Sequence, residues 1–123
     1  MKFLDSSIWL AHLLEANEKI SDVFEYEGLI FSSILTIFEV KKKLVHEKFD
    51  SVKVHNSIEL IKKVSIVVNL NEEIIDKAVK FSVQNKLSSI DSLIYASAMN
   101  VSARLITADN DFRKLENVEV INK

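Results

Sequence analysis

The 123-residue sequence contains no cysteine and no proline, and it has a single glycine, Gly28. Without cysteine the chain forms neither disulfides nor thiolate zinc sites, which is compatible with a reducing compartment. No proline-rich, glycine-rich or low-complexity stretch marks a linker, and no internal repeat is evident. We therefore expect a single compact domain that covers residues 1–123.

Long hydrophobic runs are also missing. The apolar segments are far shorter than the roughly 20 residues that a membrane-spanning helix requires. Asp5 interrupts the N-terminal segment where an export signal would be apolar, so no export signal is expected. A hydrophobic content of 48% is nevertheless enough for a core in one domain of this length. These features predict a soluble protein of the cytoplasm.

The net charge of −2 does not by itself identify a partner. Four of the 18 acids are candidates for one site, as argued below, and without them the 16 Lys and Arg residues outnumber the remaining acids. Lysines cluster at residues 41–43 and at residues 62–63. Such a run is often only the solvated face of a helix, and this alternative stays open.

Hydrophobic periodicity predicts strands that alternate with helices along the whole chain. Strands are expected at residues 2–5, 29–33, 64–68, 104–109 and 118–121, and helices at residues 6–15, 17–26, 35–48, 50–63, 71–86, 88–99 and 111–115. This alternation favours a parallel sheet covered by helices on both faces. The predicted fold is a three-layer α/β/α domain with a mostly parallel central sheet of about four to five strands.

Four acids fall at the ends of these elements. Asp5 ends the first strand, Asp109 follows the fourth, Glu39 lies in the first turns of the helix after the second strand, and Asp91 begins the helix that leads to the fourth. Ligands of open parallel sheets bind beyond the carboxyl ends of the strands. If the first, second and fourth strands are neighbours, Asp5, Glu39 and Asp109 share this edge. Asp91 joins them if its helix begins there.

Three of these acids also have a purely structural explanation, because Asp5, Asp91 and Asp109 each lie where a helix begins. Glu39 differs, since its neighbours in residues 34–40 are almost all apolar and a buried carboxylate is rare unless it is paired or coordinates a metal. A cluster of carboxylates needs compensating positive charge, and a hard divalent cation supplies it. We expect Ser6 to cap the first helix, which would leave the Asp5 carboxylate free to face a metal.

Four segments carry a resemblance to a known family. F-L-D-S-S (residues 3–7), S-I-L-T-I-F-E-V (33–40), I-D-S-L-I-Y-A-S-A (90–98) and L-I-T-A-D-N-D-F (105–112) resemble, in order and spacing, the motifs of PIN-domain ribonucleases. The similarity is greatest to the single-domain VapC-type toxins of toxin–antitoxin pairs, and it extends from end to end of the chain. Each motif alone is weak, but four in the right order are strong evidence.

The resemblance implies a PIN-like fold and an endoribonuclease that depends on Mg²⁺ or Mn²⁺. Asp5, Glu39, Asp91 and Asp109 match the family's catalytic and metal-binding acids. Ser6 and Thr107 match supporting hydroxyl residues, and Asp111 stands where some relatives carry an auxiliary acid. The resemblance also implies cleavage to a 5′-phosphate and a 3′-hydroxyl, pairing with an antitoxin protein, and a homodimer.

Lysine side chains are expected to hold the RNA through its phosphates, and the candidates are Lys41, Lys42, Lys43 and Arg113. Many VapC-type chains have a glycine where this chain has Lys41–Lys43, and many have alanine in place of Tyr95. These departures concern loop geometry and RNA preference rather than the chemistry. The three histidines have no nucleophile nearby in the sequence, so we expect no role for them in the reaction.

Other interpretations of the acids fit less well. A haloacid-dehalogenase-type phosphatase needs a second acid two residues after the first, where this chain has Ser7. A response-regulator receiver domain needs an acid at the end of its middle strand, but residues 64–68 are followed by Asn69. A housekeeping RNA-processing PIN nuclease and a non-catalytic PIN scaffold that binds RNA or protein both remain open.

Overall fold

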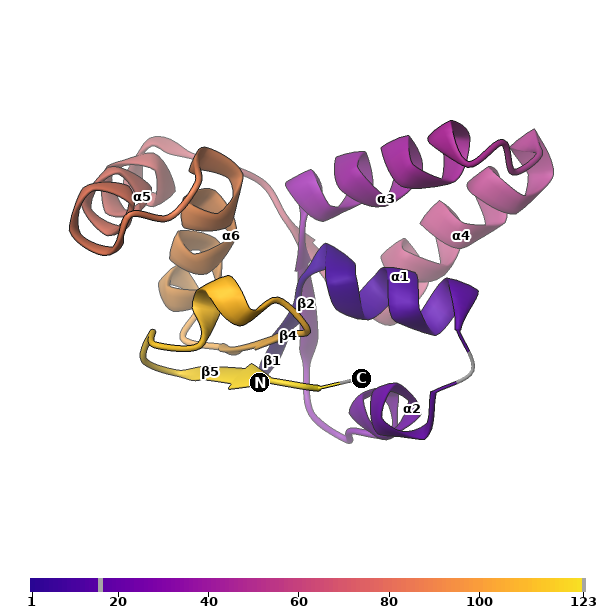
Figure 1. Cartoon of the computed structure of the whole chain (residues 1–123), viewed down its shortest axis with the longest axis horizontal. Helices are drawn as coiled ribbons and strands as arrows, with labels where there is room; N and C mark the ends of the chain where they lie inside the picture. Colours follow the sequence, from indigo (N-terminus) through magenta and orange to yellow (C-terminus); the bar gives the residue numbers. More distant parts are fainter. Residues whose placement is uncertain (16, 123) are drawn as a thin grey trace.

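The computed structural model describes residues 1–15 and 17–122, and in this part of the chain five short strands alternate with helices (Figure 1). The elements are β1 (Lys2–Leu4), α1 (Ser6–Leu14), α2 (Glu18–Phe24), β2 (Ile30–Ser33), α3 (Ile34–His46), α4 (Ser51–Val64), β3 (Ile66–Val68), α5 (Glu72–Asn85), α6 (Ser89–Asn100), β4 (Arg104–Thr107), the 3₁₀-helix η1 (Asn110–Phe112) and β5 (Val118–Val120).

The five strands form one parallel sheet in the order β3-β2-β1-β4-β5. β1 is central, and its Phe3 is in register with Phe31 of β2 and Leu105 of β4. Helices α1 to α4 lie on one side of the sheet, and α5 and α6 lie on the other (Figure 1). The predicted three-layer α/β/α architecture is therefore confirmed, and the sheet is parallel throughout.

Alternating side chains of the central strands build two separate cores. Leu4, Ile30 and Ile106 pack with α1, α2, α3 and α4, whereas Phe3 and Leu105 pack on the opposite face with α6. All five of these side chains are less than a tenth exposed. Because both faces of the sheet are covered, its strands are apolar on both sides, as parallel sheets require.

Local boundaries differ from the predicted ones where capping chemistry competes with strand formation. β1 ends at Leu4, because the Asp5 side chain accepts a hydrogen bond from the Ile8 backbone N–H and so caps α1. The expectation that Ser6 caps this helix is wrong. β3 begins at Ile66 rather than at Val64, because Val64 is the last residue of α4 and Ser65 caps the end of that helix.

The sheet order settles where the candidate acids lie. β2, β1 and β4 are adjacent, so the segments that follow them begin at one edge of the sheet. These segments are the N-termini of α1 and α3 and the turn that leads to η1. α6 packs along α5 and begins close to the same edge, since Asp91 in its first turn lies near Asp109 and Asp111. The carboxyl edge of the three central strands is therefore lined by acids.

Candidate active site

Asp5 is the most buried of the candidate acids, with a side chain that is 6% exposed. One carboxylate oxygen accepts hydrogen bonds from the Ser7 hydroxyl at 2.5 Å and from the Ile8 backbone N–H at 3.3 Å. The other oxygen accepts a hydrogen bond from the Thr107 hydroxyl. A carboxylate offers about four acceptor positions. The oxygen bonded to Thr107 therefore retains one lone pair for a further ligand.

Two hydroxyl groups connect Asp5 to the segment that carries Asp109. The Ser7 hydroxyl accepts a hydrogen bond from the Ala108 N–H at 2.8 Å, and the Thr107 hydroxyl accepts one from the Asp109 N–H at 3.0 Å. Each hydroxyl thus donates to Asp5 and accepts from the backbone after β4. These hydrogen bonds join the end of β1 to the end of β4, and they fix the position of Asp5 relative to the Asp109 backbone.

Ser7 is a site residue that the sequence reasoning missed as a hydrogen-bond partner of Asp5. The sequence D-S-S offers two adjacent hydroxyls, and nothing in it decides which one turns back toward the carboxylate. Ser6, the residue expected to support Asp5, instead hydrogen-bonds to the Glu39 carboxylate on α3. Ser6 and Ser7 therefore support different acids.

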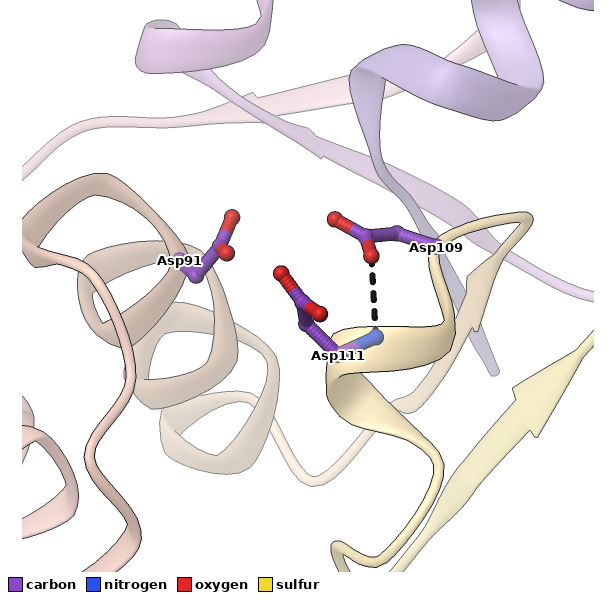
Figure 2. A group of neighbouring side chains, drawn as sticks. All are labelled: Asp91, Asp109 and Asp111. Atoms are coloured by element: carbon purple, nitrogen blue, oxygen red, sulfur yellow. Dashed lines mark hydrogen bonds between the residues drawn. The ribbon is translucent and has the colours of Figure 1, made fainter.

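Asp91, Asp109 and Asp111 form the tightest acid group among the described residues. One carboxylate oxygen from each lies within 4.8 Å of the others, and the three side chains point into the same space from α6, from the turn after β4 and from η1 (Figure 2). The Asp109 carboxylate also accepts a hydrogen bond from the Asp111 N–H at 2.9 Å, which caps η1. Asp111, considered only an auxiliary acid from the sequence, is thus an equal member of this group.

Asp5 and Glu39 are coupled by their charges to the group of Asp91, Asp109 and Asp111, so that five carboxylates form one cluster. Burial, with a smaller contribution from the charge of Asp109, raises the pKa of Asp5 to about 6, against the hydrogen bonds that its carboxylate accepts. Burial also raises the pKa of Asp91, and the charges of Asp109 and Asp111 act in the same direction. Burial raises the pKa of Glu39, the Ser6 hydrogen bond opposes this, and the Asp91 charge adds to it.

Protein cations do little to neutralise these acids. Within residues 1–15 and 17–122, the ion pairs join Lys43 to Glu47, Lys62 to Glu59 and Lys77 to Glu73, and none includes an acid of the cluster. Lys42 has an influence, because its charge lowers the pKa of Glu39. Several converging carboxylates with free oxygen lone pairs and almost no cation fit a hard divalent ion. The residues present therefore suit Mg²⁺ or Mn²⁺.

The other residues singled out from the sequence lie outside the acid group. Lys42 and Lys43 line a groove beside Glu39, whereas Lys41 faces other hollows of α3 and α4. Arg113 donates hydrogen bonds to the side chains of Asn110 and Asn122. Tyr95 is a core residue: its ring packs edge-on against Phe81, and its hydroxyl donates to the Glu116 carbonyl.

The parallel three-layer α/β/α fold and the acid cluster at the carboxyl edge of its sheet together define a class of domain with a metal-ion site. They do not identify a particular protein. The family model of the PIN domain matches residues 2–118, so the chain belongs to the PIN domain family. This confirms the family expected from the four sequence motifs. A search of curated protein sequences gives no significant match.

Solved structures share the fold over almost the whole chain at low sequence identity. A toxin–antitoxin complex from Klebsiella pneumoniae is 18% identical over 98% of this chain and 97% of its own, with a TM-score of 0.84. VapBC2 of Rickettsia felis, bound to a DNA fragment from its promoter, is 13% identical over 98% of both chains, with a TM-score of 0.84. The sarcin–ricin-loop-cleaving toxin VapC20 of Mycobacterium tuberculosis is 17% identical over 98% of both chains, with a TM-score of 0.78.

None of the helices in the described part of the chain is both long and apolar enough to cross a membrane.

Proposed function

We propose that this protein is a divalent-metal-dependent endoribonuclease that hydrolyses RNA phosphodiester bonds, with the whole chain acting as one PIN domain. The observation that carries the proposal is the convergence of five carboxylates at the carboxyl edge of the sheet with almost no protein cation to balance them. Membership of the PIN family supports it. A structural neighbour with the same fold, VapC20, is a toxin that cleaves the sarcin–ricin loop.

Asp91, Asp109, Asp111 and the remaining lone pair of Asp5 are the groups that would hold Mg²⁺ or Mn²⁺. A bound ion of this kind acidifies a water molecule and stabilises the negative charge that develops on the phosphate. Ser7 and Thr107 keep Asp5 ionised and oriented, since both donate hydrogen bonds to its carboxylate. Glu39 is half-buried with a raised pKa, and so it is suited to orient the attacking water and accept its proton.

The reaction balances as a hydrolysis. The water oxygen forms a bond to phosphorus, and the bond from phosphorus to the 3′-oxygen breaks. One proton of the water passes to Glu39, and the leaving 3′-oxygen takes up a proton from the solvent. The products are a 5′-phosphate and a 3′-hydroxyl. No group of the protein becomes covalently attached to the RNA.

We further propose that the protein is the toxin of a type II toxin–antitoxin pair in the cytoplasm. Structural neighbours were solved as such pairs, among them VapBC-1 of Haemophilus influenzae, which is 19% identical with a TM-score of 0.79. The corresponding partner here is an antitoxin protein. A short adjacent reading frame that encodes a DNA-binding segment would support this role, whereas a lone gene within an RNA-processing operon would favour the housekeeping alternative.

A homodimer is the proposed assembly, and α5 offers a surface for it. Ile75, Val79 and Val83 follow one another at four-residue intervals on this helix and are 45%, 57% and 76% exposed. Antiparallel packing of two copies about Val79 would place Ile75 against Val83 and Glu72 against Lys86, so both the apolar and the charged groups would be complementary.

Cleavage assays on a structured RNA test the proposed chemistry. We expect cleavage with Mg²⁺ or Mn²⁺, its loss on addition of EDTA, and a fall of at least about a hundredfold in Asp5→Asn and Asp91→Asn, because metal ligands contribute on this scale. Asp22→Asn, an exposed acid on α2, is the matched control and should retain full activity. Cutting that persists in the Asp5→Asn, Asp91→Asn double variant would refute the site.

A further inference from the structure

A groove next to the acid cluster shares Glu39 with it, but the apolar and basic residues of the groove take no part in the chemistry proposed above. It encloses about 440 Å³ between α1, α3 and the start of α6. Ser6 and Leu10 of α1 and Ile90 of α6 form one wall, and a face of α3 that begins at Phe38 and Glu39 forms the other. Since Glu39 belongs to the acid cluster and also lines the groove, a chain bound in the groove would continue directly into the site.

The apolar part of the groove centres on Phe38. Its side chain is 61% exposed, although it lies in the middle of a helix whose apolar residues Val40 and Leu44 are fully buried. Leu10 and Ile90 complete this apolar part, and Ile90 is 36% exposed. An exposed aromatic face beside a polar site is the usual platform on which proteins stack an unpaired nucleobase.

The charges of the groove follow a definite order along α3. Glu39 lies at the end near the acid cluster, and Lys42, Lys43 and His46 line the groove over the next two turns. Lys43 is already paired with Glu47 at 2.8 Å, whereas the Lys42 ammonium lies 5.9 Å from the centroid of the Phe38 ring. A basic group beside an aromatic face is the combination with which proteins hold a single strand, the cation by its phosphate and the ring by its base.

We propose that this groove is a nucleobase subsite: the base of an unpaired ribonucleotide next to the scissile phosphate stacks on Phe38, and Lys42 binds the adjoining phosphate. The inference rests on the proposed ribonuclease function and adds to it a requirement on the substrate. A base inside a duplex has both faces covered by its neighbours. The protein therefore cuts RNA where at least one nucleotide beside the cut is unpaired.

Lys42 and the continuity with the acid cluster favour RNA over a peptide as the occupant. An apolar peptide segment would bury Phe38 but would leave the Lys42 charge without a partner. A ribonucleotide supplies a base for Phe38, an anion for Lys42 and a phosphate for the acid cluster together with its cation. All three features of the groove then have a function in one ligand.

The test compares Phe38→Ala and Phe38→Trp with Val45→Ala. Val45 is 58% exposed on the same helix but does not line the groove beside Glu39, which makes it a matched control. The probe is a single-stranded RNA with 2-aminopurine beside the cut, which loses fluorescence when the base stacks. Its affinity is measured in the inactive Asp91→Asn background, and kcat and KM are measured with Mg²⁺ in the active protein.

We expect Phe38→Ala to weaken binding and raise KM about tenfold and to abolish the fluorescence change, since one base–aromatic stack contributes on this scale. Phe38→Trp should restore both, and Val45→Ala should match the parent protein. Lys42→Ala should reduce the slope of log affinity against log salt concentration by about one. Annealing a complementary strand across the cut should abolish cleavage by the parent protein.

Two results overturn the inference while leaving the ribonuclease function intact. The first is metal-dependent cleavage with the same KM and the same fluorescence change in Phe38→Ala as in Val45→Ala. The second is loss of a co-purified partner protein in Phe38→Ala without any change in RNA binding, which would make the groove a protein-binding site. If the parent protein cuts no RNA with Mg²⁺ or Mn²⁺, the proposed function itself fails.

Discussion

Single residues at the carboxyl edge of this sheet have two functions at once. Asp5 and Asp109 cap α1 and η1 through one oxygen each, and the same side chains face the acid cluster. Capping a helix and binding a metal do not exclude each other at these positions, because a carboxylate has two oxygens and can do both. The caps also fix the rotamers, which gives the site its preorganisation.

Asp5 makes the stability of the metal-free protein depend on pH. Its pKa is raised from 3.8 to about 6 in the folded state, so the folded state binds more protons than the unfolded state between these two values. Stability should therefore fall as the pH rises from about 4 to 7, and Asp5 should contribute about 3 kcal/mol to that fall. Above pH 7 its contribution is constant.

Urea denaturation in EDTA at several pH values measures this effect. Asp5→Asn cannot ionise at this position, so its stability relative to the parent should improve as the pH rises from 4 to 7. Other acids titrate in both proteins and cancel in the comparison. A stability difference that stays constant over this pH range would show that Asp5 has an ordinary pKa.

At the scale of the elements, α3 carries two different surfaces. Its buried residues Thr36, Val40 and Leu44 face the interior of the protein. Phe38 and Lys42 face the groove beside the acids, and Val45 is exposed to solvent. The apolar residues 34–40 predicted burial in the first half of this helix, but they could not show that its exposed side borders a groove, because α1 and α6 supply the opposite wall.

The exposed apolar residues Ile75, Val79 and Val83 of α5 lead to a prediction about the homodimer. Val79→Glu places a charge at the centre of the proposed two-fold interface, where it would meet its own symmetry copy, so the dimer should dissociate. Size-exclusion chromatography with light scattering distinguishes dimer from monomer. Val52→Glu on α4, where the valine is 66% exposed, is the control and should remain dimeric.

Two results would contradict this interface. One is a Val79→Glu variant that stays dimeric, which would place the dimer contact elsewhere. The other is a parent protein that is monomeric at every concentration, which would refute the homodimer. Circular dichroism of each variant shows that the helix content is unchanged, and Val79 is exposed in the single chain, so folding should not be affected.

For the whole molecule, metal binding should add to stability, because the acid cluster repels itself only in the metal-free state. An ion at about a hundred times its Kd stabilises the folded protein by about 2.7 kcal/mol, which corresponds to a rise in Tm of about 10 °C for a domain of this size. Thermal denaturation with and without Mn²⁺ measures the shift. It should be largely lost in Asp91→Asn and retained in Asp22→Asn.

This measurement separates metal binding from catalysis. A Tm that does not respond to Mn²⁺ or Mg²⁺ in the parent protein would show that the acids hold no divalent ion, whatever the nuclease assay gives. An equal shift in the parent and in Asp91→Asn would place the ion elsewhere on the molecule.

Much of this fold could be predicted because its elements are local in origin. Strands such as residues 104–107 are short apolar segments between turn residues, and helices such as α4 and α5 have clear apolar periodicity and capping residues at Asp50 and Asn71. The boundaries were less predictable. Val64 belongs to α4 and not to β3, and its apolar side chain next to the apolar residues of β3 suits either element.

The sequence by itself determined the fold class and the positions of Asp5, Glu39, Asp91 and Asp109 at the ends of elements, because both follow from short-range periodicity. Only the tertiary structure decided that β1 lies between β2 and β4, that Ser7 rather than Ser6 supports Asp5, and that Asp111 joins the acid group. These depend on the directions of side chains from elements far apart in the sequence. Packing alone fixes such directions.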